Sequence, residues 1–319
     1  MTAKTVAKTA AKIELLILSP RVFSGKAGKT LNMLENGLKK EALSFKISTF
    51  KEMEIFMEKG QLDIFFGGLN LNEFENIFFR KVGFNKELAF LISKLSIEKG
   101  INFIDKLYAQ FYSSTKLTQT FLFHLKGINA PKTYFSPVYD EKKLIKAGKF
   151  LGFPFVAKEC NTSQGAGVFL VENENQIKER ITAFADKQII LQEFIENNFE
   201  YRVLIMGGEI VDVEKKTRDK NSSEFRNNVH LGATEEFLDV KIFDESGKEL
   251  AFRASNALDI QIAGVDIIED LKGNRFVTEV NSTPGFTHDE KISDEIPNLI
   301  NFLKKWAKKS NFLVSNLIF

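Results

Sequence analysis

Two apolar, β-branched runs within Gly264–Gly285, near the C-terminal end, constrain the fold of this chain most strongly. The runs flank Lys272-Gly273. A run–X-Gly–run pattern predicts a β-hairpin with a tight two-residue turn, here closed by Leu271 and Asn274. A turn of that length fixes which residues of the two strands lie opposite each other.

Three side chains that carry oxygen atoms fall on one face of this predicted hairpin. The turn places Asp266 opposite Glu279, with Cβ atoms roughly 5 Å apart. Asn281, two residues further along, projects from the same face. Two close carboxylates repel each other, and a hard divalent cation removes the repulsion. An all-oxygen set with few protein ligands suits Mg²⁺ bound together with phosphates. The alternative is an exposed face of an edge hairpin, where acidic residues are common.

Composition limits the partners of the chain. Its 319 residues allow two or three packed units, and its net charge of +2 gives no global field that favours nucleic acid or a membrane. No run reaches the roughly 18 apolar residues of a membrane span. The single cysteine, Cys160, excludes an intramolecular disulfide and fits a reducing compartment. We therefore expect a cytoplasmic protein with no nucleic-acid and no membrane partner.

The first hundred residues alternate between strand-like and helix-like segments, which predicts a small α/β domain. The expected strands lie at 12–19, 45–50, 62–66, 77–80 and 101–104, and the expected helices reach from 28 to about 41 and from 85 to 99. Gly28-Lys29-Thr30 imitates the end of a phosphate-binding P-loop. Phe23 stands where that motif needs its first glycine, so the segment is interpreted as a helix start.

A strand, a small polar loop with glycines and a return strand follow at 155–171. Backbone N–H groups of such a loop can hold phosphate oxygens without help from side chains. Lys158 stands in the apolar first strand, where its charge is costly unless it reaches solvent or meets an anion. A Gly-x-Gly loop alone is weak evidence, because loops without ligands also use glycine.

Six segments, in this order and spacing, resemble the motifs of ATP-grasp ligases, and among them the RimK and glutathione-synthetase-like branch. They are Lys116 at a helix start, Pro154–Lys158, Gln164–Val168, Gln192–Ile195 with Glu200–Arg202, Phe225–His230, and Gly264–Asp266 with Glu279–Gly285. The resemblance runs from about Ser113 to Lys305. One departure is Leu231-Gly232-Ala233, where RimK-type enzymes commonly carry Arg-Gly-Gly.

The resemblance implies a mixed α/β (α+β) protein with an ATP-grasp fold and an N-terminal pre-ATP-grasp α/β domain. The expected parts are a basic arm (1–12), the pre-ATP-grasp domain (13–105), a lysine and glycine-loop subdomain (106–190), a Mg-binding subdomain (191–310) and an apolar tail (311–319). Arg80 resembles an arginine found on a strand of that first domain.

The resemblance also implies roles for nucleotide-binding residues. Lys116 and Lys158 would reach the phosphates of ATP, and backbone groups of Glu193 and Phe194 would read the adenine edge. Glu200 would accept hydrogen bonds from the ribose hydroxyls. The glycine loop over the phosphates would contain Gln164, Gly165 and Gly167.

Two further groups of residues would serve the metal and the chemistry. Asp266, Glu279 and Asn281 match the family's ligands for Mg²⁺, which Mn²⁺ can replace. Arg226 and Asn228 would lie near the γ-phosphate and the acyl phosphate. Arg202 would pair either with a neighbouring carboxylate or with a ligand phosphate.

The activity that the resemblance implies is ATP-dependent carboxylate–amine ligation. A carboxylate would attack the γ-phosphorus to give an acyl phosphate and ADP, and an amine would then displace phosphate. The expected partners are ATP, a carboxylate donor and an amine acceptor (an amino acid, small peptide or protein tail), with the chain in a homo-oligomer. The alternatives are a ligase that modifies a ribosomally made peptide precursor, with the N-terminal domain as docking surface, and a nucleotide-binding regulatory module without ligase activity.

Overall fold

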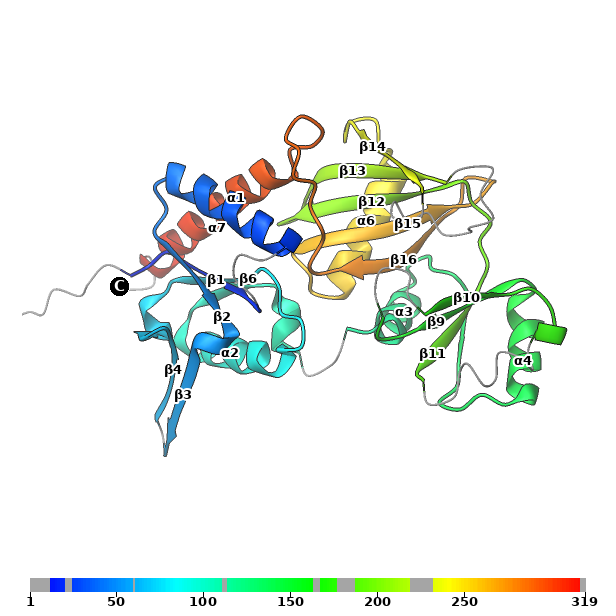
Figure 1. Ribbon diagram of the computed structural model, residues 1–319, viewed down its shortest axis with the longest axis horizontal. Helices are drawn as coiled ribbons and strands as arrows, with labels where there is room; N and C mark the ends of the chain where they lie inside the picture. Colours follow the sequence, from blue (N-terminus) through cyan, green and yellow to red (C-terminus); the bar gives the residue numbers. More distant parts are fainter. Residues whose placement is uncertain are drawn as a thin grey trace, which may run out of the picture. The chain divides into compact units, whose positions relative to one another are not determined.

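The structure is a computed structural model that describes residues 12–20, 25–59, 61–110, 114–162, 167–176, 187–218 and 232–315 (Figure 1). The chain forms two compact units. Unit 1 contains Met1–Phe111 and Phe286–Phe319, and unit 2 contains Tyr112–Gly285. Strands and helices are mixed in both units, which confirms the predicted fold class. None of the helices within the described residues combines the length and apolar composition that crossing a membrane requires.

Unit 1 is built on a four-stranded parallel sheet in the order β2-β1-β6-β7. Every residue of β1 is buried, as expected for a parallel strand covered on both faces. Gly28-Lys29-Thr30 lies inside helix α1, which confirms that it begins a helix rather than a P-loop. The elements are β1 (Leu15–Ser19), α1 (Gly25–Lys40), β2 (Phe45–Thr49), β6 (Asn76–Phe79), α2 (Lys86–Lys99), β7 (Asn102–Ile104) and the 3-10 helix η3 (Lys106–Ala109).

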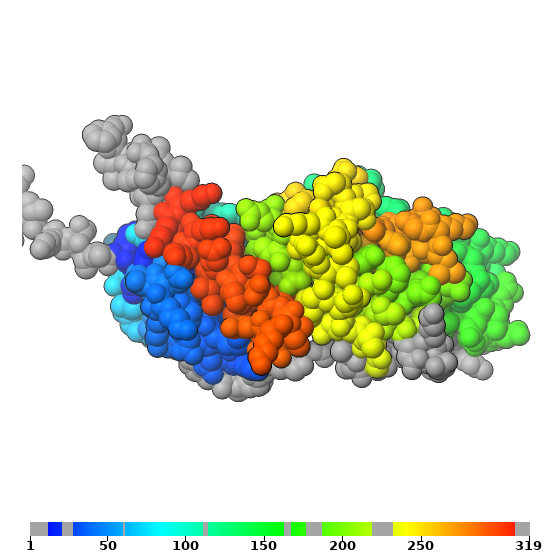
Figure 2. Space-filling model, turned by 90° about the horizontal axis from the view of Figure 1, so that it is seen from above, coloured from blue at the N-terminus to red at the C-terminus, as the bar shows by residue number. Residues whose placement is uncertain are grey.

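The last long helix, α7 (Glu295–Ser315), packs against α1 in unit 1 (Figures 1 and 2). A Cβ atom on Gly37 would overlap the side chain of Ile300, so glycine allows the two helices to approach closely. Asn76 on β6 donates a hydrogen bond to the carbonyl of Ala307 at 3.4 Å. The end of the chain is thereby part of the same unit as its beginning.

A small antiparallel sheet in the order β3-β4-β5 completes unit 1. The sequence pattern predicts only its central strand. The edge strand β3 is missed because Glu54, Phe56 and Glu58 give it a largely exposed outer face. The bounds are η1 (Phe50–Glu52), β3 (Met53–Glu58), β4 (Gln61–Phe66), β5 (Leu69–Asn70) and η2 (Leu71–Glu73).

Unit 2 begins with helix α3 (Lys116–Leu125) and a four-stranded antiparallel sheet in the order β10-β9-β11-β8. Helix α4 (Glu141–Leu151) packs on this sheet through Leu144, Ala147 and Leu151, which are buried in a shared apolar cluster. The strands are β8 (Thr133–Phe135), β9 (Phe155–Glu159), β10 (Val168–Val171) and β11 (Ile189–Glu193).

A five-stranded antiparallel sheet in the order β14-β13-β12-β15-β16 forms the rest of unit 2. Helix α6 (Glu245–Ala257) packs against β12, β15 and β16. Val203, Val265 and Ile267 on the central strands are completely buried, while charged residues alternate with them along the same strands. The strands are β12 (Phe199–Met206), β13 (Glu209–Thr217), β14 (Thr234–Leu238), β15 (Ile262–Glu269) and β16 (Arg275–Asn281).

The hairpin of β15 and β16 confirms one part of the sequence prediction and corrects another. Asp266 lies opposite Glu279, as predicted. The predicted two-residue turn is wrong, because β15 ends at Glu269 and β16 begins opposite it at Arg275. The carboxylate of Asp270 accepts backbone hydrogen bonds inside this longer turn. A bulge between the turn and Asp266 then shifts the register by one residue and restores the predicted pairing.

Candidate active site

One face of the five-stranded sheet carries charged residues in rows that cross the strands. Arg202 on β12 lies between Glu214 on β13 and Asp266 on β15, and Asp266 in turn lies opposite Glu279 on β16. In an antiparallel sheet, directly opposed residues project from the same face. Strand pairing therefore brings four charged side chains, from positions between 202 and 279, into a single row.

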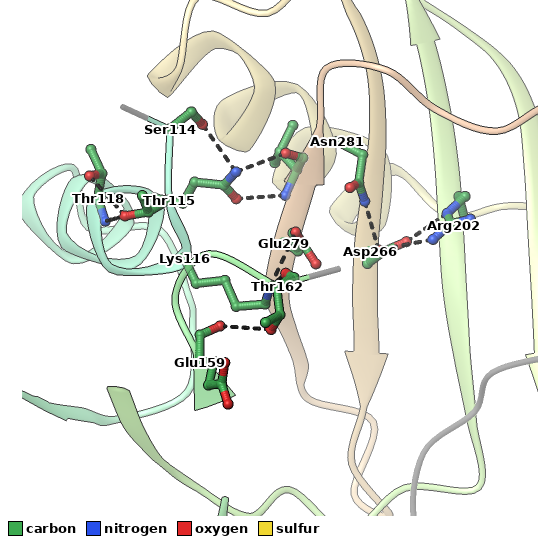
Figure 3. Close-up of polar contacts among 12 residues, drawn as sticks. Ser114, Thr115, Lys116, Thr118, Glu159, Thr162, Arg202, Asp266, Glu279 and Asn281 are labelled. Atoms are coloured by element: carbon green, nitrogen blue, oxygen red, sulfur yellow. Dashed lines mark hydrogen bonds and ion pairs between the residues drawn. The ribbon is translucent and has the colours of Figure 1, made fainter. Parts of the chain in front are cut away.

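Asp266 is held by two neighbours in this row (Figure 3). Arg202 donates to both of its carboxylate oxygens, through Nε at 2.8 Å and Nη2 at 3.1 Å. Asn281 Nδ2 donates to Asp266 Oδ2 at 3.0 Å. Burial alone would raise the pKa of Asp266, but the charge and hydrogen bonds of Arg202 hold that pKa below its ordinary value. The carboxylate is thus ionised, oriented and hydrogen-bonded at both oxygens.

Lys116 approaches the same row from the N-terminus of α3 (Figure 3). Its Nζ lies 3.9 Å from Glu279 Oε1 and also donates to the carbonyl of Thr162. Thr115 caps the helix by accepting from the N–H of Thr118 at 3.3 Å. A lysine in the first turn faces the positive end of the helix dipole. Lys116 therefore costs α3 some stability, which points to a role other than holding the helix.

A buried glutamine fixes α3 against β16. Gln119 Nε2 donates to the carbonyl of Val280, and its Oε1 accepts from the N–H of the same residue, both at 2.9 Å. Val280 stands between Glu279 and Asn281 on an edge strand. The two hydrogen bonds therefore fix the position of Lys116 relative to both of these side chains.

Lys158 reaches the site from β9, where it is half-buried. Burial lowers its pKa to about 8, although the charge of Glu279 raises the pKa and partly offsets this effect. Lys116, Glu200 and Asp266 also act on the pKa of Lys158. Two lysines from different elements thus lie within electrostatic range of the carboxylates on the five-stranded sheet.

A second row of charge contains Glu200 on β12 and Lys216 on β13, which are directly opposed. Lys216 Nζ lies 3.8 Å from Glu200 Oε1 and 3.4 Å from Glu214 Oε1. Burial raises the pKa of Glu200 to about 7, with a further contribution from Asp266, while Lys216 opposes the rise. Burial likewise raises the pKa of Glu214 to about 8.

Sequence reasoning does not identify Glu214 and Lys216 as site residues. The apolar run of this segment ends at Val213, whereas β13 continues to Thr217. The signal is present in the sequence, because Asp212, Glu214 and Lys216 alternate with valine residues and a lysine. Alternation of that kind marks a strand with one polar face.

A comparison with protein-family models decides the classification. The model described as the RimK-like ATP-grasp domain matches residues 113–300. The chain belongs to the RimK-like ATP-grasp family.

Curated relatives show moderate identity to the chain. A protein named probable alpha-L-glutamate ligase from Cellvibrio japonicus (strain Ueda107) is 35% identical over 179 residues, covering 54% of this chain and 56% of the relative. A protein of the same name from Syntrophotalea carbinolica (strain DSM 2380 / NBRC 103641 / GraBd1) is 34% identical over 204 residues, covering 61% and 65%. The chain therefore spans less than two thirds of the length of these relatives.

Solved structures share the fold at low identity. The ATP-grasp ligase PsnB, complexed with the precursor peptide PsnA2 and AMPPNP, superposes with a TM-score of 0.69 at 16% identity, covering 94% of this chain and 100% of that chain. D-alanyl-alanine synthetase A from Vibrio cholerae O1 biovar eltor str. N16961 gives 0.66 at 16% identity, covering 94% and 99%. These likenesses confirm the ATP-grasp fold.

The family's hinge and loop positions are only partly described by the structure. Glu193 ends β11, and Phe194 begins the link from the four-stranded sheet to β12. Glu193 Oε1 accepts from the N–H of Lys132 at 2.8 Å, so its side chain helps to hold β8 beside β11. Gly167 has a positive φ of 68°, and a Cβ there would overlap the Glu159 side chain. Four predicted site residues lie outside the described residues: Gln164, Gly165, Arg226 and Asn228.

The donor set at the hairpin fits Mg²⁺. No group of three His, Cys, Asp or Glu side chains that could hold a metal occurs within the described residues. Two carboxylates and one amide oxygen, from Asp266, Glu279 and Asn281, remain as hard ligands on one strand pair. Such a small oxygen set suits an ion that keeps water or takes phosphate oxygens as its other ligands. Asn281 donates to Asp266 through Nδ2, so its Oδ1 is the atom that could approach a metal.

Proposed function

We propose that this protein is an ATP-dependent carboxylate–amine ligase that forms an amide bond through an acyl phosphate. The observation that carries the proposal is the position of Glu279. It lies opposite Asp266 on one side and 3.9 Å from Lys116 on the other. Carboxylates for a cation and lysines for phosphate oxygens thus meet around one point, as a metal–nucleotide complex requires.

The two lysines supply most of the charge that would neutralise the phosphates. Lys116 approaches from α3 and Lys158 from β9. Fixed cations stabilise the charge that spreads over a transferring phosphoryl group without reorganisation at the moment of reaction. Mg²⁺, held by Asp266, Glu279 and Asn281, would neutralise the β- and γ-phosphates further. Gly167 and its neighbours Gln164 and Gly165 would cover the phosphates with backbone N–H groups.

The two bonds of the reaction then need no protein nucleophile. An oxygen of the donor carboxylate attacks the γ-phosphorus as the bond to the ADP oxygen breaks. The nitrogen of the acceptor amine next attacks the acyl carbon, the bond to phosphate breaks, and the amine loses a proton. We assign Arg226 and Asn228 to the charged intermediates, Arg202 to the neighbouring carboxylates of its own sheet, Glu200 to the ribose, and the backbone of Glu193 and Phe194 to adenine.

The substrates follow less directly from the residues. The relatives are named alpha-L-glutamate ligases, which supports an amino acid as one partner, and the PsnB structures contain precursor peptides, which supports a peptide as the other. Leu231-Gly232-Ala233 replaces the Arg-Gly-Gly that is common in RimK-type enzymes. We therefore propose an amino acid, small peptide or protein tail as acceptor, and a homo-oligomer in the cytoplasm as the working form.

The test is phosphate release from ATP and Mg²⁺ in the presence of paired amino acids and peptides, with product masses read by mass spectrometry. We expect acceptor-dependent phosphate release and a product heavier by one amide-linked residue. Glu279→Gln should lower the release about 10²–10³-fold, whereas Glu236→Gln, which changes an exposed carboxylate on β14, should leave it unchanged. ATP binding without phosphate release over a broad panel would favour the alternative of a nucleotide-binding regulatory module.

A further inference from the structure

Arg202 stands between two carboxylates that belong to different neighbouring strands. The register places it opposite Asp266 on β15 and opposite Glu214 on β13. Its guanidinium is committed to Asp266, with hydrogen bonds of 2.8 and 3.1 Å to the two oxygens. The side chain is 29% exposed, so it retains room to move. Arg202 therefore has two carboxyl neighbours on one sheet face, and its two hydrogen bonds to them both go to Asp266.

The contacts of Asp266 leave little capacity for a metal. Arg202 occupies both carboxylate oxygens, and Asn281 Nδ2 donates to Oδ2 at 3.0 Å. An arginine in this position already balances the charge of Asp266, and it competes with a cation for the same lone pairs. A divalent cation that approaches without nucleotide would find Glu279 as its available charged ligand in this row, and Lys116 lies 3.9 Å from that carboxylate.

Glu214 differs from Asp266, because one of its carboxylate oxygens accepts no hydrogen bond within the described residues. Its side chain is 8% exposed, and within the described residues its Oε1 is buried without a hydrogen-bond partner. Lys216 Nζ lies 3.4 Å from this oxygen. A buried carboxylate oxygen that lacks a hydrogen bond carries a desolvation cost, which a guanidinium donor would remove. Burial, followed by a hydrogen bond with Glu235, raises the pKa of Glu214 to about 8, and the charge of Arg202 lowers that pKa. A guanidinium that moves closer therefore favours the ionised form of Glu214, which makes this residue a second acceptor for Arg202, one strand away from the first.

We infer that Arg202 is a two-position counter-ion: it holds Asp266 in the nucleotide-free protein and shifts toward Glu214 when metal and nucleotide arrive together. This inference rests on the proposed function, because it takes Asp266 as a metal ligand. Until nucleotide binds together with a divalent cation, the guanidinium of Arg202 occupies the position beside Asp266 that the cation would take. Glu214, which sequence reasoning does not single out, is then a positioning residue whose role is to receive Arg202. The consequence is that the metal site opens only with nucleotide bound.

The test uses Mn²⁺ as a spectroscopic stand-in for Mg²⁺ and the full-length chain. Electron paramagnetic resonance measures bound Mn²⁺ with and without a non-hydrolysable ATP analogue. We expect the wild-type protein to bind Mn²⁺ weakly alone and at least about tenfold more tightly with the analogue. Arg202→Met frees Asp266, so nucleotide-free Mn²⁺ affinity should rise about tenfold, with Arg202→Lys intermediate. Arg202→Lys also serves if the methionine variant fails to fold.

Glu214→Gln tests the second position of Arg202. It should leave nucleotide-free Mn²⁺ binding unchanged and weaken Mn²⁺ binding in the presence of the analogue about tenfold. In the Arg202→Met background, Glu214→Gln should no longer weaken Mn²⁺ binding, because the guanidinium that Glu214 would bind is absent. Glu236→Gln, on the neighbouring strand and exposed, is the matched control and should change neither affinity.

The outcomes separate this inference from the proposed function. Unchanged nucleotide-free Mn²⁺ affinity in both Arg202 variants, with analogue-dependent binding intact, overturns the counter-ion role alone. An undiminished Glu214→Gln effect in the Arg202→Met background overturns the role of Glu214. Failure of the wild-type protein to bind the analogue at all overturns the proposed function, and the counter-ion role with it.

Discussion

The parallel sheet of unit 1 and the five-stranded sheet of unit 2 use charge in opposite ways. All five residues of β1 are buried and none is charged. On β12, Glu200 and Arg202 alternate with the buried residues Tyr201 and Val203. A strand covered on both faces has only packing to contribute, whereas a strand with one polar face can present a row of charges. The comparison teaches that side-chain changes in the first sheet should affect folding, and changes on the charged face of the second should affect ligand chemistry.

The largest expected effect is on the folding of unit 1. Leu18→Ala removes a completely buried side chain from the main apolar cluster of that unit, so we expect a loss of about 2.7–5.0 kcal/mol in the free energy of unfolding. Trp306, the only tryptophan, lies in α7, so its fluorescence during urea unfolding reports on this unit. Leu62→Ala is the matched control, because Leu62 is 41% exposed. If Leu18→Ala and Leu62→Ala lost equal free energy of unfolding, burial in the parallel sheet would not be what stabilises unit 1.

The next largest effect is on the rate of the proposed ligation. Glu279→Gln keeps the size of the side chain and removes the charge of a proposed metal ligand, so the ligation rate should fall about 10²–10³-fold, or about 2.7–4 kcal/mol of transition-state stabilisation. The urea midpoint by Trp306 fluorescence should stay that of the wild type. A variant that keeps its rate but loses stability would show that Glu279 serves packing instead, and would remove the distinction between the two sheets.

A pH dependence of nucleotide binding sharpens the comparison further. The pKa of Lys158 is about 8 against an ordinary 10.5, so the ammonium loses its proton in the folded protein above pH 8. Nucleotide phosphates favour the protonated form, and the affinity for ATP should fall up to tenfold for each pH unit above 8, or about 1.4 kcal/mol. Calorimetry in buffers of different ionisation enthalpy should detect proton uptake on binding at pH 8–9.

The lowered pKa of Lys158 also makes the free energy of unfolding depend on pH. Between about pH 8 and 10.5 the unfolded chain binds more protons at Lys158 than the folded protein does. The free energy of unfolding of the nucleotide-free protein should therefore rise with pH through this window. Lys158→Gln should remove both the proton uptake on binding and this slope. Proton uptake that persists in Lys158→Gln would assign the titration to another group.

The smallest effect concerns an exposed ion pair of unit 1. Lys39 and Glu35 on α1 are four residues apart, with Nζ and Oε1 separated by 2.6 Å and the lysine 63% exposed. Lys39→Met should cost no more than about 0.5 kcal/mol in the free energy of unfolding, because solvent and salt screen such pairs. Repeating the unfolding in 1 M salt should reduce the difference. A larger cost would mean that surface charge in unit 1 matters as it does in the charged rows of unit 2.

The sequence allows the charged hairpin to be predicted from residue pairing alone. Asp266 and Glu279 face each other as expected, although the turn is longer than expected and a bulge compensates for it. Turn length and bulge are invisible to an alternation pattern, because they depend on how Asp270 binds backbone N–H groups in the turn. The family resemblance adds the ATP-grasp fold, which neither residue spacing nor composition gives.

Other parts of the site depend on tertiary structure. Strand β13 continues through Glu214 and Lys216, beyond its apolar run, because β12 and β14 supply partners for the backbone groups there. The sequence gives no sign of the role of Gln119, because its two hydrogen bonds go to the backbone of β16, which is distant along the chain. Helix α4 escapes notice because its apolar face is narrow, although Leu144, Ala147 and Leu151 keep helical spacing.

The contact between Gln119 and Val280 also bears on strand addition at one edge of the five-stranded sheet. The strand that carries Glu279 and Asn281 is an edge of its sheet, and edge strands offer unpaired N–H and C=O groups to strands of other molecules. The amide of Gln119 imitates the backbone of a neighbouring strand and takes both groups of Val280. A glutamine side chain thereby occupies the backbone groups of Val280 that an added strand would need, and we expect it to hinder aggregation through this edge.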